Sequence, residues 1–281
     1  MKLPPHAARR TKQFRPNRLL VSLVIAAFAG CSEKEDTVET VRSALTGYHF
    51  GVATESSYQD NWNVTLDYST ENGSEFGSRL AENNTWDWQF TTLQWGKPYF
   101  EETGDAWWSG IDTVHALYTN THGNVNSSTA YMAMWEKDTF AYTTAMRLGD
   151  DSVGLGLLAA YACHLLKFDD GLLPTRWGNA LRGGLYYLMG SQDIVYDGWT
   201  LSDTGEQVAE NLNDGDLLYH AWFDGVGDCC YDQDGAVVST GRSLGECEAR
   251  RDNTQWPNIM AYVRLRDSDV QWQCWRYLND I

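Results

Sequence analysis

The stretch VGLGLLAAYAC, residues 153–163, is apolar, aromatic or small at every position and ends at a cysteine. A run that is apolar on both faces suits the centre of a parallel β-sheet, where other elements cover both sides. An earlier stretch, IDTVHALYT at residues 111–119, also has the composition of a buried strand and leads into Asn-Thr-His-Gly-Asn at 120–124. These two stretches predict two buried strands, one followed by His122 and the other by Cys163.

Strand and helix patterns alternate on both sides of these two runs. Further strands are expected at 47–54, 130–135 and 185–190. Helices are expected at 75–81, at 138–148, after Pro174 through Arg176–Arg182, and at 204–224, the last weakened by Asp214-Gly215. Repeated strand, loop and helix predict an α/β fold, a three-layer sandwich with a mostly parallel central sheet.

The N-terminus has the pattern of an export signal. Residues 1–18 carry six basic side chains and no acidic one, and an apolar run at 19–28 follows them. That run is too short to span a bilayer comfortably, and small residues before a cut are typical of a secretory signal. Ala29-Gly30-Cys31 resembles the bacterial lipobox, in which the thiol is lipidated, although Phe28 stands where leucine is usual.

We therefore expect a lipoprotein signal peptide at 1–30, lipid on Cys31, and a polar tether at 31–46. This predicts a lipid-anchored protein of the cell envelope, at the outer membrane or the cell surface. The alternative is an ordinary signal peptide that is cut nearby, with Cys31 incidental.

The charge of the chain excludes one class of partner. The net charge is −17, and it becomes −23 once the six basic residues of the leader are removed. Phosphate repels so acidic a protein, so we expect no nucleic-acid partner. The expected contact with a membrane is through the lipid anchor.

The remaining 235 residues are enough for one large domain, or for one domain with an appendage. We predict an α/β domain at 47–225 and a small cysteine-rich, disulfide-bearing C-terminal appendage at 226–281. The 13 tryptophans indicate an aromatic core, or else a surface that stacks on sugar rings or peptide side chains.

Cysteine parity separates one thiol from the others. Four of the five cysteines beyond Cys31 lie in the last 53 residues, namely Cys229, Cys230, Cys247 and Cys274. Clustered cysteines of exported proteins usually form disulfides. Neighbouring cysteines rarely bond each other, so Cys229 and Cys230 are expected to pair separately with Cys247 and Cys274, in either arrangement. Cys163 is left over as a functional thiol or as a buried, inert one.

His122 and Cys163 are the candidate chemical pair. Functional groups gather at the carboxyl ends of strands in an open α/β sheet, so both side chains would emerge together if their strands are parallel neighbours. An imidazole favours the thiolate and can later protonate a leaving amine. The backbone N–H groups of Gly123 and Cys163 could form an oxyanion hole.

These blocks resemble those of a known group of enzymes. VHALYTNTHG at 114–123 and LLAAYAC at 157–163 are similar to the His-Gly and Ala-Cys blocks of cysteine peptidases with the caspase–hemoglobinase fold. The segment Trp177–Ser191 resembles the helix and glycine-rich strand start that follow the cysteine in that fold. The resemblance covers about 112–224, and it extends to uncharacterised bacterial secreted proteins with a His-Gly-Asn block and a later cysteine block.

The resemblance implies an endopeptidase that acts on a peptide or protein substrate. Cys163 would be the nucleophile and His122 the proton-transfer group, with no fixed third member and no cofactor. Two alternatives stay open: a non-catalytic surface lipoprotein of the same fold, and a carbohydrate-active protein, in which two carboxylates would flank a sugar bond.

Several other polar residues are expected to play no part in the chemistry. His164 follows the cysteine but should point elsewhere, and His115 is expected to be a core histidine. Asp169 and Asp170 form a solvated turn or select a basic side chain. The segment Asp232-Gln233-Asp234-Gly235 resembles half a calcium loop, but the match fails at its first and last ligand positions, so no metal site is predicted.

Overall fold

The computed structural model of the chain describes residues 48–59, 65–82, 86–151, 153–198, 203–227, 233–256, 265 and 269–278. The chain divides into two units, Met1–Ala44 and Leu45–Ile281, and all described residues belong to the second. The predicted signal peptide at 1–30 and tether at 31–46, with Cys31, therefore lie outside the described residues. Cys229 and Cys230 also lie outside them.

A seven-stranded sheet forms the centre of the domain, in the order β10-β9-β8-β7-β3-β1-β2. Its strands are β1 (Tyr48–Thr54), β2 (Trp86–Thr92), β3 (Ala116–Asn120), β7 (Leu157–Tyr161), β8 (Tyr187–Ser191), β9 (Gly235–Gly241) and β10 (Trp272–Tyr277). The run from β2 to β8 is parallel, and β9 and β10 are antiparallel to their neighbours. Every residue of β3, β7 and β8 is buried, which confirms the predicted α/β class with a mostly parallel sheet.

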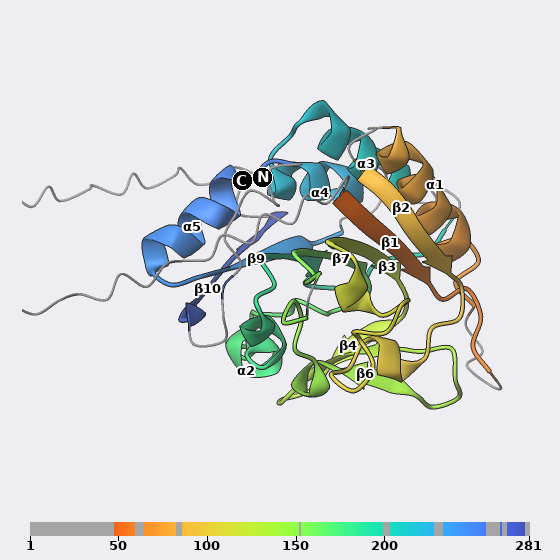
Figure 1. Ribbon diagram of the computed structural model, residues 1–281, viewed down its shortest axis with the longest axis horizontal. Helices are drawn as coiled ribbons and strands as arrows, with labels where there is room; N and C mark the ends of the chain where they lie inside the picture. Colours follow the sequence, from red (N-terminus) through yellow and green to blue (C-terminus); the bar gives the residue numbers. More distant parts are fainter. Residues whose placement is uncertain are drawn as a thin grey trace, which may run out of the picture. The chain divides into compact units, whose positions relative to one another are not determined.

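Helices cover one face of this sheet, in the upper part of Figure 1. They are α1 (Ser69–Ala81), α3 (Thr204–Asp214), α4 (Leu218–Gly227) and α5 (Leu244–Asn253). The single helix expected at 204–224 is two helices, because Gly215 takes a left-handed conformation with φ +88° and ends α3. Of the helices in the described ranges, none combines the length and the apolar character needed to cross a membrane.

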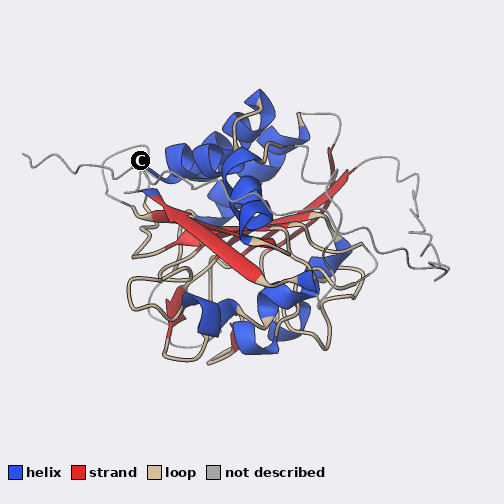
Figure 2. Ribbon diagram, turned by 90° about the vertical axis from the view of Figure 1, so that its left-hand side faces the viewer, coloured by secondary structure: helices blue, strands red, loops and turns tan. Residues whose placement is uncertain are grey.

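Short elements cover the other face, so the third layer contains little regular helix (Figures 1 and 2). They are α2 (Leu173–Trp177), the 3₁₀ helices η1 (Lys97–Tyr99), η2 (Ile111–Thr113), η3 (Thr143–Ala145) and η4 (Ala180–Gly183), and a small sheet of β4 (Gly123–Val125), β5 (Ala130–Ala133) and β6 (Phe140–Tyr142). The prediction of a helix at 138–148 is wrong, because that segment contains β6 and η3. Its aromatic and β-branched residues favour a strand.

The segment expected to form an appendage at 226–281 is continuous with the main fold. Its strands β9 and β10 extend the central sheet beyond β8. The predicted boundary at 225/226 therefore does not separate two bodies, although the segment does carry a disulfide.

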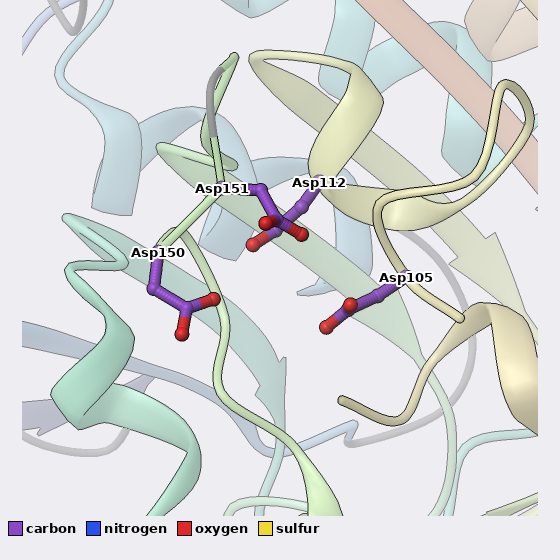
Figure 3. A group of neighbouring side chains, drawn as sticks. All are labelled: Asp105, Asp112, Asp150 and Asp151. Atoms are coloured by element: carbon purple, nitrogen blue, oxygen red, sulfur yellow. The ribbon is translucent and has the colours of Figure 1, made fainter. Parts of the chain in front are cut away.

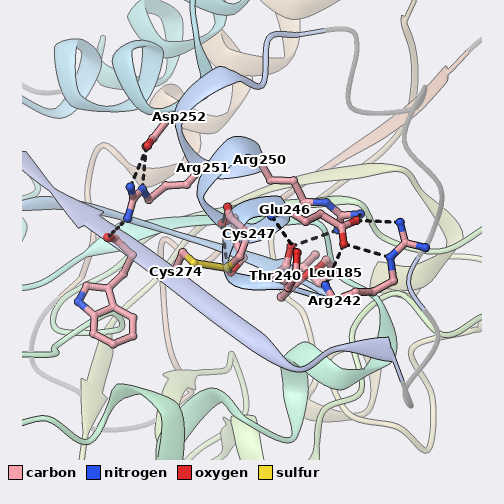
Figure 4. Close-up of a disulfide and its surroundings, with 12 residues drawn as sticks. Leu185, Thr240, Arg242, Glu246, Cys247, Arg250, Arg251, Asp252 and Cys274 are labelled. Carbon is pink, nitrogen blue, oxygen red and sulfur yellow. Dashed lines mark hydrogen bonds and ion pairs between the residues drawn. A yellow bond between two sulfur atoms is a disulfide. The ribbon is translucent and has the colours of Figure 1, made fainter. Parts of the chain in front are cut away.

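The disulfide joins Cys247 on α5 to Cys274 on β10 (Figure 4). The expectation that each of them pairs with Cys229 or Cys230 is wrong. Helix α5 lies over β9 and β10, and Cys274 is opposite Ser239, whose hydroxyl donates to the carbonyl of Cys247 at 2.7 Å. This packing brings the two Cα atoms to 5.7 Å, a distance that suits a disulfide.

The Asp169-Asp170 turn has a structural role. The side chain of Arg176 on α2 is 3% exposed and donates to the carbonyl oxygens of Asn126 (2.6 Å) and Lys167 (2.8 Å), and to both carboxylate oxygens of Asp170. This hydrogen bonding lowers the pKa of Asp170 below its ordinary value. The turn therefore anchors the third layer.

Replacing Asp170 with alanine should destabilise the domain by about 1–3 kcal/mol, because the buried Arg176 loses its counter-charge but keeps its two carbonyl acceptors. Asp169→Ala removes only a 3.8 Å pair with Lys167 at an exposed position and should change stability by less than about 0.5 kcal/mol. Urea unfolding measures both. Equal effects of the two variants would contradict this role for Asp170.

Candidate functional site

The candidate site begins where β3 and β7 end. The two strands are parallel neighbours, with Asn120 opposite Tyr161, and the Thr121 N–H donates to the Tyr161 carbonyl at 3.3 Å just beyond the last pair. His122 and Cys163 each lie two positions past that last pair. The expected adjacency of the two strands is therefore confirmed, and their carboxyl ends share one edge of the sheet.

The His-Gly block lies directly against the cysteine block. A Cβ atom built on Gly123 would stand 2.6 Å from the carbonyl oxygen of Cys163 and 3.0 Å from the Cβ of Ala162. Only glycine permits this approach without a shift of backbone.

His122 and Cys163 line the same pocket, which has a volume of about 190 Å³. Four segments of chain form its wall, contributing Thr65, Leu66, Asn120, Thr121, His122, Tyr161, Cys163, Val195, Tyr196 and Asp197. The structure thus brings the imidazole and the thiol predicted from the sequence to one concave surface, of the kind in which ligands bind.

Tyr58, in the loop after β1, positions His122. Its ring stacks on the imidazole with centroids 5.2 Å apart and an interplanar angle of 28°. Its hydroxyl accepts the His122 backbone N–H at 3.1 Å and lies 3.0 Å from Oγ1 of Thr121. Since Thr121 donates its own proton to the Ala133 carbonyl, the Tyr58 hydroxyl must donate to Thr121. The orientation of the histidine is therefore fixed from two sides.

Cys163 is half-buried and carries a protonated thiol at neutral pH. Its Sγ donates to the carbonyl oxygen of Val195 at 3.5 Å. Burial raises the pKa of the Cys163 thiol above its ordinary value, and the nearby Asp193 adds to this effect. The thiol is thus held by the loop after β8, in an arrangement that favours its neutral form.

Asp197 contributes a carboxyl group to the pocket, and sequence reasoning did not name it. Its Oδ2 accepts the Tyr68 backbone N–H at 3.1 Å. Burial raises the pKa of the Asp197 carboxyl, while the charge of His122 acts in the opposite direction. The two groups therefore interact electrostatically. The sequence signal that could have identified Asp197 was its position after β8, at the carboxyl edge of the sheet.

The other two candidate histidines lie elsewhere. His164 has φ +55°, and its Nδ1 stands 3.5 Å from Oδ1 of Asp193, outside the residues that line the pocket. His115 is 2% exposed and accepts the His49 backbone N–H on Nδ1 at 3.0 Å. Burial lowers the pKa of His115 to about 4, so it is a neutral core histidine as expected.

The backbone donors expected at Gly123 and Cys163 remain a prediction. Gly123 opens β4 and pairs with Met132 of β5, so the ladder of the small sheet holds its peptide unit beside the pocket. Among the described residues, the side chains grouped closely enough to share a metal ion are four aspartates, none of which lines this pocket.

Comparisons with known proteins give a family and a likeness of fold. The sequence model described as "Domain of unknown function (DUF6345)" matches residues 49–272. No curated protein sequence matches the chain.

Two solved structures are similar to the chain in fold alone. One is a secreted C11 cysteine protease from Bacteroides thetaiotaomicron, "iotapain", with 13% identity and a TM-score of 0.40, covering 69% of this chain and 66% of its own. The other is the Drosophila initiator caspase Dronc, with 13% identity and a TM-score of 0.41, covering 78% of this chain and 92% of its own.

Gly123→Ala should destabilise the domain by about 1–3 kcal/mol, because the added methyl group overpacks the contact between the two blocks. The control is Gly245→Ala on α5, where an added Cβ meets nothing within 4 Å. That substitution should be neutral or stabilising by up to about 1 kcal/mol, since alanine favours helix. Thermal unfolding measures both, and equal losses would contradict the close approach at Gly123.

Proposed function

The chain belongs to the DUF6345 family, and we propose that it is an exported, lipid-anchored cysteine endopeptidase that cleaves peptide bonds with Cys163 and His122. The family description names no activity, so the proposal rests on this chain's own residues. The observation that carries it is the placement of a thiol and an imidazole in one pocket, at the shared carboxyl edge of two parallel strands.

The proposed reaction is acyl transfer to sulfur. His122 removes the thiol proton, and Sγ of Cys163 bonds to the carbonyl carbon of the substrate while the carbonyl electrons move to oxygen. Backbone N–H groups of Gly123 and Cys163 stabilise that oxyanion. His122 then donates the proton to the amine as the C–N bond breaks, and water hydrolyses the resulting thioester.

Asp197 supports this cycle from the wall of the pocket. During the reaction the imidazole is transiently protonated, and a carboxylate nearby stabilises that cation. Tyr58 keeps the imidazole ring oriented by stacking on it.

The resting thiol requires activation before it can react. It is protonated and donates to the Val195 carbonyl, so the loop that carries Val195 must release it when substrate binds. This hydrogen bond also favours a second candidate, a non-catalytic surface lipoprotein that keeps the fold but leaves the thiol unused.

Substitutions in the pocket distinguish these candidates. Cys163→Ala should lower kcat/KM for peptide cleavage by at least about a thousandfold, because the covalent route disappears. His122→Ala should lower it by about a hundredfold to ten-thousandfold. His220→Ala on α4, outside the lining of the pocket, is the matched control and should keep full activity. A library of fluorogenic peptides supplies the assay, and undiminished cleavage by Cys163→Ala would end the proposal.

The pH dependence of thiol alkylation gives a second measurement. Since the pKa of Cys163 is raised, the thiolate fraction at pH 7 is smaller than that of a free cysteine, and iodoacetamide should react faster as the pH rises. His122→Ala should slow alkylation at neutral pH if the imidazole helps to form the thiolate. An identical pH profile in both proteins, with no peptide cleavage by either, would support the non-catalytic candidate.

The anchor is tested separately from the chemistry. Expressed in a bacterium with radiolabelled fatty acid, the wild-type protein should take up label and Cys31→Ala should not. Ser32 rather than aspartate follows the cysteine, so we expect sorting to the outer membrane in a host with two membranes. Equal labelling of both proteins would contradict lipidation at Cys31.

A further inference from the structure

Four aspartates meet at the edge of the sheet opposite the pocket. Asp105 and Asp112 lie before β3, and Asp150 and Asp151 lie before β7, so the group stands at the amino ends of these strands. One carboxylate oxygen from each residue lies within 4.8 Å of the others. Figure 3 shows the four carboxylates, which come from three segments of the chain, directed toward a common space.

Asp105 gives an independent indication of a ligand in that space. Its side chain is 2% exposed, and its Oδ2 is buried with no hydrogen-bond partner. A buried carboxylate oxygen without a partner is costly, and such an atom in a native protein calls for an unseen ligand. In Figure 3 the carboxylate of Asp105 is directed into the space that the other three aspartates border.

Asp112 is held in place by the backbone of the neighbouring loop. It is 1% exposed and accepts N–H bonds from Gly149, at 2.9 and 2.7 Å, and from Leu155, at 3.3 Å. These bonds fix the carboxylate and the loop 149–155 relative to each other, so the ligand set is preorganised.

Four carboxylates in so small a space repel one another unless positive charge lies among them. Arg147 supplies one such charge, since its Nε is 3.7 Å from Oδ2 of Asp150. A divalent cation bound between the carboxylates would balance the charge of the group more fully.

We propose that Asp105, Asp112, Asp150 and Asp151 bind a calcium ion. An all-oxygen, carboxylate-rich set suits a hard divalent cation and not a transition metal that prefers imidazole or thiolate. Calcium binds oxygen at about 2.3–2.6 Å, so opposite ligands stand about 4.6–5.2 Å apart, which matches the spacing of the group. Magnesium usually takes only one or two carboxylates and keeps its waters.

The ion ties three segments together at the base of the central strands. These segments are the loop with Asp105, the 3₁₀ helix η2 with Asp112, and the loop with Asp150 and Asp151. Hydrogen bonds also join them, such as Asp112 N–H to the Asp105 carbonyl at 3.2 Å and Gly149 N–H to the Asp112 carboxylate. Calcium therefore stabilises the amino ends of β3 and β7. This role is independent of the chemistry proposed at their carboxyl ends.

The test uses the mature full-length protein, first stripped with EDTA. Calcium chloride at millimolar concentration should raise its Tm by several degrees, and titration calorimetry should give a dissociation constant between about 10⁻⁵ and 10⁻³ M. Magnesium chloride at the same concentration should have a much smaller effect. No shift with calcium, or tighter binding of magnesium, would overturn the assignment.

Asparagine variants test which residues bind the ion. Asp105→Asn and Asp151→Asn should each weaken calcium binding at least about tenfold, whereas Asp214→Asn, at an exposed position on α3, should not. Asp151 is only partly buried, so its asparagine variant should fold even if a change at Asp105 does not. Equal affinity in all three variants would place the ion elsewhere.

Terbium luminescence provides a readout independent of stability. Trp107 and Trp108 follow Asp105 closely and are 62% and 85% exposed, so they are suited to transfer excitation to terbium bound at the group. Calcium should quench the terbium signal by displacement in the wild-type protein, and Asp151→Asn should lose the signal. A signal that calcium does not displace would contradict a shared site.

Discussion

The pairing of β3 with β7 is the constraint on which the rest of the structure depends. Ten buried residues in parallel register form the middle of the sheet. Because the register is fixed by burial on both faces, a slip of one residue would turn every side chain to the opposite layer. The same register determines which residues stand beyond the strands at each edge, so His122 and Cys163 line one pocket at one end and Asp112 lies near Asp150 at the other.

The sequence predicts the parts of the fold that long apolar runs encode. The runs at 153–163 and 111–119 contain the strands β7 and β3, and they are recognisable because a continuous apolar run of this length suits a buried strand. The positions of His122 and Cys163 follow from where those runs end. The helix predicted at 138–148 failed because β6 and η3 are each only three residues long, too short for periodicity to distinguish. The position of Asp197 after β8 was the signal for its place in the pocket, and it was not used. The Cys247–Cys274 bond could not be predicted, since it depends on how α5 folds back over the sheet.

The electrostatic environments at the two edges of the sheet differ. At the carboxyl edge the thiol is buried beside a carbonyl, which favours its neutral form, and chemistry requires that this arrangement change. At the amino edge four carboxylates, two of them buried, lie beside one another, and a cation bound between them relieves their repulsion. The core between them is rigid and close-packed, so the two edges share a scaffold without sharing a ligand.

The disulfide of α5 and β10 has a consequence for where the protein can be made. β10 is the edge strand of the sheet, and it carries Trp272 and Trp275, which are 44% and 38% exposed. In a reducing cytosol this strand is held by its antiparallel ladder with β9, by packing, and by polar contacts with α5 such as that of Arg251 Nη1 with the Trp275 carbonyl, at 3.1 Å. Any peeling of β10 would uncover the unpaired backbone of β9, a surface to which another chain can add a strand. Production in an oxidising compartment should prevent this aggregation, since the Cys247–Cys274 disulfide keeps β10 paired at the edge of the sheet.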